Sequence, residues 1–153
     1  MLRVSETAII PRPVDEVFAA ASDPLKQLEW DPATMKRVEK LTPGPLGRGS
    51  RYRAAFKGMG TVEYDFPDFD PPRRFSHRTR LPMGEMRHTF ILEPVPQGTR
   101  LTQEGELRPT LLGRLMQPLM ARMLRRRFRT VAQELSEYLE AAPRGAPGTP
   151  PQR

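Results

Sequence analysis

The sequence predicts an α+β fold in which a curved antiparallel sheet of six to seven strands grips one long C-terminal helix. The helix is predicted over residues 111–142, where apolar side chains recur at steps of three or four residues. The sheet is predicted by short segments between residues 35 and 107 that alternate in polarity and are separated by turns. Strands that follow one another across short turns pair antiparallel, and their apolar face needs a helix to cover it.

The first thirty residues predict one strand followed by two short helices. Residues 2–10 alternate in polarity, which is typical of a strand. Pro13 suits a helix N-terminus, where Asp15 and Glu16 of the first turn interact favourably with the helix dipole. A second short helix is expected over residues 25–30.

The remaining strands and the long helix complete the domain. Pro118 is expected to kink the helix in its first third, because proline removes one backbone hydrogen bond and crowds the preceding turn. Residues 143–153 are rich in proline and glycine and are expected to be a disordered tail, which leaves residues 1–142 as a single helix-grip ligand-binding domain. The strands are predicted over residues 35–41, 51–57, 60–69, 75–81, 85–94 and 100–107.

Composition excludes several classes of protein. The chain has 153 residues, enough for one domain with its own core. It contains no cysteine, which excludes disulfides, thiolate catalysis and cysteine-ligated zinc. No apolar run approaches the roughly 20 residues of a membrane span, and the N-terminus lacks an apolar signal core. A cytoplasmic protein is therefore expected.

The formal net charge of +7 indicates either an anionic partner or a basic exterior. Because arginines occur along the whole chain, a solvated, arginine-rich exterior is the favoured interpretation. One local cluster, Arg122 to Arg129, lies on the predicted long helix. It is either a solvated outer face or a peripheral contact with an anionic membrane. Nucleic acid binding is disfavoured because no exposed aromatic side chains accompany the cluster.

Alternation also predicts which side chains of the sheet face the helix. In residues 51–57, Arg51, Arg53 and Lys57 share one face, so the opposite face points inward. The same reasoning gives the whole inner wall, which comprises Tyr52, Ala54, Phe56, Val62, Tyr64, Phe66, Phe75, His77, Thr79, Met86, His88, Phe90, Leu92, Leu101, Gln103, Gly105 and Leu107.

Both histidines of the chain therefore face inward. With a hairpin turn at Met83-Gly84, His77 would oppose Phe90 and lie diagonal to His88, about 7 Å away at the backbone. Two neutral imidazoles facing a cavity could orient a ligand hydroxyl or carbonyl, or move a proton near neutral pH. Alternatively, each imidazole only hydrogen-bonds a neighbouring Tyr or Gln. Two histidines without an inward carboxylate are too few to bind a metal, so no metal and no cofactor is expected.

A few polar groups on an apolar wall are typical of a small-molecule pocket. Tyr52, Tyr64 and Gln103 are the other inward polar side chains, and each needs either a protein partner or a ligand. Trp30 either caps the mouth of the cavity or staples the short helices to the sheet. The predicted ligand-binding residues are Trp30, Tyr52, Phe56, Tyr64, Phe66, Phe75, His77, Met86, His88, Phe90, Gln103, Met116, Leu119, Met120 and Met123.

Four sets of short motifs carry a resemblance to a known family. In their order and spacing, the sequence resembles the START-like helix-grip (SRPBCC) superfamily, in its polyketide cyclase/dehydrase and lipid-transport branch, over residues 1–142. The resemblance implies a curved antiparallel sheet that grips a C-terminal helix around a hydrophobic cavity. Members of the superfamily include lipid and sterol carriers, quinone-binding proteins and aromatase/cyclases. The motifs are PVDEVF (Pro13 to Phe18) with SDP (Ser22 to Pro24) and Trp30, GRGSRY (Gly47 to Tyr52), DPPRRF (Asp70 to Phe75) and GTRLT (Gly98 to Thr102).

The inner wall and the resemblance together predict that the protein binds or transports a small hydrophobic ligand. The ligand would be a lipid, a polyketide-like aromatic or a quinone-like molecule, held between sheet and helix. The alternative is a cofactor-independent polyketide cyclase or dehydratase, in which His77 or His88, with Tyr52 or Tyr64, moves protons. A third class is an interaction module that applies its basic helix to an acidic partner, RNA or a membrane. No particular oligomeric state is predicted.

Overall fold

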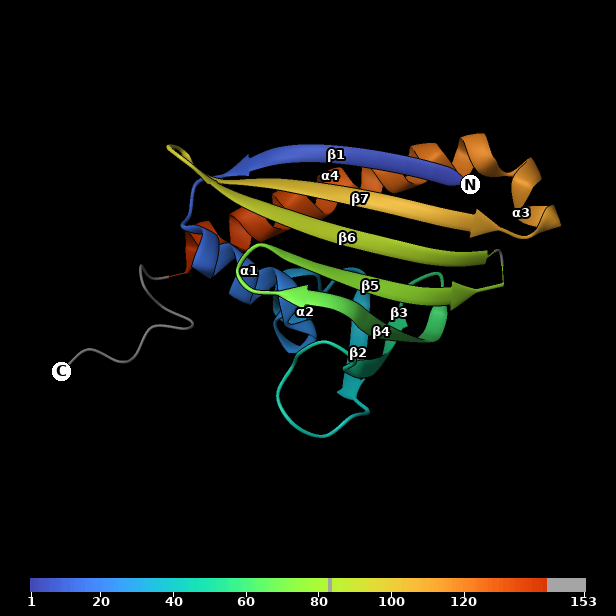
Figure 1. The fold of residues 1–153 in the computed structure, drawn as a ribbon, viewed down its shortest axis with the longest axis horizontal. Helices are drawn as coiled ribbons and strands as arrows, with labels where there is room; N and C mark the ends of the chain where they lie inside the picture. Colours follow the sequence, from blue (N-terminus) through green and yellow to red (C-terminus); the bar gives the residue numbers. More distant parts are fainter. Residues whose placement is uncertain (83, 143–153) are drawn as a thin grey trace.

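The computed structural model describes residues 1–82 and 84–142, and the tail predicted over residues 143–153 lies outside this part of the chain. Figure 1 shows one curved sheet with the long C-terminal helix running across it, and the predicted α+β helix-grip fold is confirmed. In chain order the elements are β1 (Leu2–Ile10), α1 (Val14–Ser22), α2 (Pro24–Trp30), β2 (Met35–Lys40), β3 (Arg51–Phe56), β4 (Gly60–Asp70), β5 (Arg74–Leu81), β6 (Gly84–Val95), β7 (Gly98–Pro109), α3 (Leu111–Leu115) and α4 (Gln117–Ala141).

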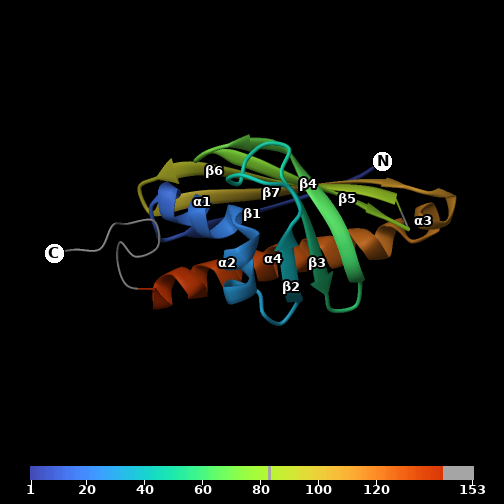
Figure 2. The same ribbon diagram turned by 90° about the horizontal axis from the view of Figure 1, so that it is seen from below.

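The sheet has seven strands in the order β1-β7-β6-β5-β4-β3-β2, and every neighbouring pair is antiparallel. Strands adjacent in sequence are also neighbours in the sheet from β2 to β7, as short turns require. The exception is β1, which returns to pair with β7. Figure 2 shows the sheet curving over α4, while α1 and α2 lie at the end where β1 leaves the sheet.

The histidine register differs from the prediction. Leu81 pairs with Gly84, so His77 lies directly opposite His88 rather than opposite Phe90. The register differs by two residues because the hairpin turn precedes Gly84 instead of including it. A shift of two residues keeps every side chain on the same face, so both histidines still point inward. They become direct cross-strand neighbours, with ring centroids 6.2 Å apart.

Gly84 is required at the start of β6 by its backbone and by its surroundings. Its φ of +139° lies in a region that side-chain-bearing residues avoid. A Cβ at this position would also lie 2.1 Å from the carbonyl oxygen of Arg108 on β7. The close approach of β6 and β7 at this end of the sheet therefore depends on glycine.

The long helix is divided, and much of its predicted apolar face is exposed. Met116 is the C-cap of α3, and Pro118 lies in the first turn of α4, where its missing N–H costs no helical hydrogen bond. The predicted kink is therefore a break. The predicted burial holds for Phe128, Val131 and Leu135, but it is wrong for the N-terminal residues, because α3 lies at the far end of the sheet. The exposed residues are Leu112, Leu115, Met116, Leu119 and Met123.

Candidate functional site

A cavity of about 200 Å³ lies between the inner face of the sheet and α4. Its wall is mostly apolar, and its polar side chains come from five elements (α2, β4, β5, β6 and α4) and from the loop before β2. The lining residues are Gln27, Trp30, Thr34, Phe56, Met59, Val62, Tyr64, His77, Thr79, Met86, His88, Phe90, Leu124, Arg127, Phe128 and Val131.

The residues predicted to bind a ligand fall into three groups in the structure. One group lines the cavity and comprises Trp30, Phe56, Tyr64, His77, Met86, His88 and Phe90. A second group is buried behind the wall and comprises Tyr52, Phe66, Phe75 and Gln103. The third group lies on α4 and at its N-terminus away from the cavity: Met116, Leu119 and Met123 are exposed, and Met120 is half-buried.

Two polar atoms on the inner wall have no hydrogen-bond partner among the described residues. They are the hydroxyl oxygen of Tyr64 on β4 and the Nε2 atom of His77 on β5, and both are buried. The two rings meet edge-on, with centroids 5.2 Å apart. Burial raises the pKa of Tyr64 and lowers the pKa of His77 to about 4, so both side chains are neutral at pH 7. Buried polar atoms are normally paired, so these two atoms are exceptional in keeping unused hydrogen-bonding capacity.

The second histidine, His88, has a hydrogen-bond partner at its Nε2 atom, in contrast to His77. Gln103 donates from its Nε2 to the carbonyl oxygen of Phe128 at 2.8 Å, which leaves its Oε1 to face His88 Nε2 at 3.0 Å. His88 must therefore donate from Nε2, and its Nδ1 carries the lone pair. Burial, followed by the nearby His77, lowers the pKa of His88 to about 3. Gln103 thus joins the sheet to α4 and fixes the tautomer of His88.

The ring of Phe128 closes the cavity from the helix side. It stacks on His88 with centroids 4.4 Å apart and an interplanar angle of 16°. Gly105 lies opposite His88 in the sheet, and a Cβ there would lie 2.8 Å from Phe128 Cζ. The absence of a side chain at residue 105 therefore sets how closely α4 approaches the wall.

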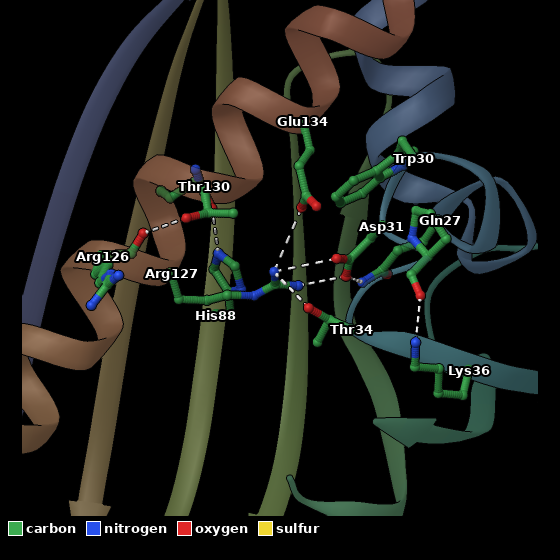
Figure 3. Close-up of polar contacts among 12 residues, drawn as sticks. Gln27, Trp30, Asp31, Thr34, Lys36, His88, Arg126, Arg127, Thr130 and Glu134 are labelled. Carbon is green, nitrogen blue, oxygen red and sulfur yellow. Dashed lines mark hydrogen bonds and ion pairs between the residues drawn. The ribbon is translucent and has the colours of Figure 1, made fainter. Parts of the chain in front are cut away.

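An ion-pair cluster connects α2 to α4 beside the cavity, as Figure 3 shows. The side chain of Asp31, which is 0% exposed, accepts from Arg127 Nη2 at 2.5 Å and from Gln27 at 3.1 Å. Arg127 also lies 3.4 Å from the hydroxyl of Thr34 and 3.6 Å from the carboxylate of Glu134. Burial and the neighbouring Asp31 raise the pKa of Glu134 to about 7.

Several cavity-lining residues are absent from the predicted ligand-binding set, and Arg127 is the charged one among them. It belongs to the predicted basic cluster, but nothing in the run Arg125, Arg126, Arg127 marks it as the one that turns toward α2. The position of Trp30 differs from both of the roles that the sequence left open, because its hydrogen bond joins the two short helices to each other and not to the sheet. Trp30 lines the cavity, and its indole N–H donates to the carbonyl oxygen of Ala20 at 2.9 Å, which staples α2 to α1.

The chemistry of the site is that of neutral polar groups on an apolar wall. The one cation, Arg127, is already paired with a buried carboxylate. Within residues 1–82 and 84–142, no group of three or more His, Asp or Glu side chains is placed to hold a metal ion. The arrangement can hold an apolar molecule and hydrogen-bond one or two of its polar atoms.

Comparison with known proteins agrees with this architecture. Residues 1–140 match the model of a family described as polyketide cyclase/dehydrase and lipid transport. No curated protein is detectably similar to the chain in sequence.

Among solved structures, a START superfamily protein from Mycobacterium smegmatis has a TM-score of 0.76 at 17% identity, over 90% of this chain and 97% of the other. Protein MLL2253 from Mesorhizobium loti has a TM-score of 0.73 at 18% identity, over 92% and 98% of the two chains. DynU16, from the dynemicin biosynthetic locus, has a TM-score of 0.65 at 22% identity, over 92% of this chain and 47% of its own. At these identities the likeness shows the fold.

Proposed function

This chain belongs to the polyketide cyclase/dehydrase and lipid transport family, and on that premise we propose that it binds a small, mostly apolar molecule between the sheet and α4. The observation that carries the proposal is the pair of unpartnered atoms on the cavity wall, Tyr64 Oη and His77 Nε2. Leaving such a group unpaired costs about 1–3 kcal/mol. A ligand that hydrogen-bonds to these atoms removes this cost, and binding is favoured by the same free energy.

The volume of the cavity limits the size of the ligand. A dry cavity of about 150 Å³ is enough to hold benzene. The cavity of about 200 Å³ therefore suits a molecule of one or two fused rings. This favours a quinone-like or polyketide-like aromatic ligand over a long acyl chain, which would need a larger space.

The protonation states favour binding over acid–base chemistry. Burial lowers the pKa of His77 to about 4 and that of His88 to about 3, so both imidazoles are weak bases at pH 7. The hydroxyl of Tyr64 donates well to a carbonyl or hydroxyl oxygen of a ligand. His77 then adds a second polar contact that orients the ring.

The test measures the affinity of three ring systems of similar size for the purified protein by isothermal titration calorimetry. The probes are naphthoquinone, naphthol and naphthalene, of which only naphthalene lacks a polar atom. We expect naphthoquinone and naphthol to bind about fivefold more tightly, because one hydrogen bond contributes about 1 kcal/mol. Tyr64→Phe should remove most of this difference without lowering stability, since its hydroxyl has no partner in the free protein.

Tyr138→Phe is the matched control. The Tyr138 hydroxyl donates to Glu29 at 2.7 Å, and the residue does not line the cavity. The control should bind all three probes as the wild type does. The proposal fails if none of the probes binds the wild type, or if the preference for polar probes survives in Tyr64→Phe.

A further inference from the structure

Six large apolar side chains are exposed along α3 and the first turns of α4, and we call them the apolar patch. The three leucines of α3 are 74–81% exposed, and Met116, Leu119 and Met123 are 43–60% exposed. Scattered exposed leucines are ordinary, but a contiguous group of this size marks an interaction surface. The apolar patch comprises Leu111, Leu112, Leu115, Met116, Leu119 and Met123.

The net charge of the chain is concentrated around the apolar patch, contrary to the expectation of an evenly basic exterior. Residues 107–133 contain seven arginines and no acidic residue. The rest of the chain then has 18 basic and 18 acidic residues, so its net charge is zero. Within this segment only Arg127 and Arg129 form ion pairs in the described structure. Five arginines remain without a carboxylate partner there, namely Arg108, Arg114, Arg122, Arg125 and Arg126.

We propose that the apolar patch docks on the surface of an anionic lipid bilayer. Leucine and methionine side chains enter the boundary between headgroups and acyl chains, while arginines pair with lipid phosphates. α3 lies at one extreme of the molecule, as Figure 2 shows, so its leucines reach a flat surface first. Among the described residues, no helix has the length and apolarity needed to cross a bilayer. The contact is therefore peripheral.

The charge also discriminates between occupants of the apolar patch. A second copy of this chain would bring the same five unpaired arginines against the first set, which opposes association. A nucleic acid would satisfy the arginines but not the leucines, and the apolar patch has no aromatic side chain on which a base could stack. Only an anionic surface with an apolar interior satisfies both features.

The experiment measures co-sedimentation of the full chain with vesicles of phosphatidylcholine alone or mixed with phosphatidylglycerol. It needs no cavity ligand, so its outcome is independent of the proposed function. We expect binding to the mixed vesicles that weakens with added salt, and little binding to phosphatidylcholine. Arg122→Ala with Arg126→Ala should weaken binding about thirtyfold, since each arginine near an anionic surface contributes roughly fivefold. Leu112→Ser with Leu115→Ser should weaken it at least tenfold.

Matched controls lie on α2, on β2 and in the loop between β2 and β3. Leu25 on α2 is 54% exposed, and Arg37 and Arg48 are exposed without an ion pair in the described chain. Leu25→Ser and the pair Arg37→Ala with Arg48→Ala should bind as the wild type does. Docking is refuted if the wild type does not bind anionic vesicles or if the leucine variants bind them normally. It is also refuted if the control variants lose as much vesicle binding as the variants of the apolar patch. A dimer in analytical ultracentrifugation that Leu112→Ser with Leu115→Ser dissociates, without vesicle binding, would assign the apolar patch to a second copy instead.

Discussion

Replacing Arg127 by methionine should destabilise the protein more than the loss of an exposed ion pair would. The change preserves most of the side-chain length but leaves the carboxylate of Asp31, 0% exposed, without its cation. Removing one partner of a buried ion pair costs about 3–5 kcal/mol. Gln27 still donates to Asp31 at 3.1 Å, and the Arg127 side chain is itself 30% exposed. We therefore expect the free energy of unfolding to fall by about 2–3 kcal/mol. For a domain of this size that corresponds to roughly 5–10 °C in Tm.

A double-mutant cycle separates the lost pair from the unpaired charge. Asp31→Asn removes the buried charge, so the double variant Asp31→Asn with Arg127→Met should be more stable than Arg127→Met alone. Arg100→Met is the control for the same substitution on the surface. Arg100 and Glu93 lie 3.7 Å apart and are 47% and 56% exposed, so this change should cost less than about 1 kcal/mol.

The assay is urea unfolding at pH 7 followed by tryptophan fluorescence. Trp30 is the only tryptophan of the chain, is 5% exposed and immediately precedes Asp31 in the sequence. Its emission therefore reports the packing of α2 directly. If Arg127→Met costs no more than Arg100→Met, or if the double variant loses the full sum of the two single changes, the ion pair does not hold α2 against α4.

Two further predictions concern the same helix. Gly105→Ala should lower the free energy of unfolding in urea by about 1–3 kcal/mol, because its Cβ would lie 2.8 Å from Phe128 Cζ and push α4 outward. Gly47→Ala is the control and should be nearly neutral, since no atom lies within 4 Å of its Cβ. Equal effects of the two changes would contradict this account. Glu134→Gln tests the carboxyl whose pKa is raised to about 7: a raised pKa means that the folded state favours the protonated form, so stability is fully present at low pH and is lost as pH rises through 7. The variant should therefore be more stable than the wild type at pH 8 and similar at pH 5, and an advantage of the same size at both values would show that charge is not the cause.

The inner wall of the sheet was predictable because alternation depends only on the period of a strand. A register shift by an even number of residues leaves every side chain on the same face of the sheet. Tyr64, His77 and His88 therefore face inward even though the register differs from the prediction by two residues. The exact pairing of His77 with His88 was not predictable in the same way. It depends on which residues form the turn before Gly84, and neighbouring turn residues offered more than one choice.

Apolar periodicity identified the helix but not what covers it. The stripe that includes Leu115, Leu119 and Leu135 looks uniform in sequence, yet only its C-terminal part meets the sheet. The sequence contains the period of a helix face, whereas burial depends on where the strands end. Arg127 illustrates the same limit for the site, because its partner Asp31 is 96 residues away and the pair forms only when α2 and α4 meet.

The two halves of α4 differ in how they are held, and this connects the cavity to the outer surface. Leu135 and Leu139 fix the C-terminal half in the core, with exposures of 0% and 1%. The N-terminal half lines the cavity with Leu124 and carries Met123 of the apolar patch on its outer side. Between the halves, Arg127 binds Asp31, and the carbonyl of Phe128 accepts from Gln103. The apolar patch and the cavity therefore share the N-terminal half of α4, and these two contacts hold the helix at the point where its buried half begins.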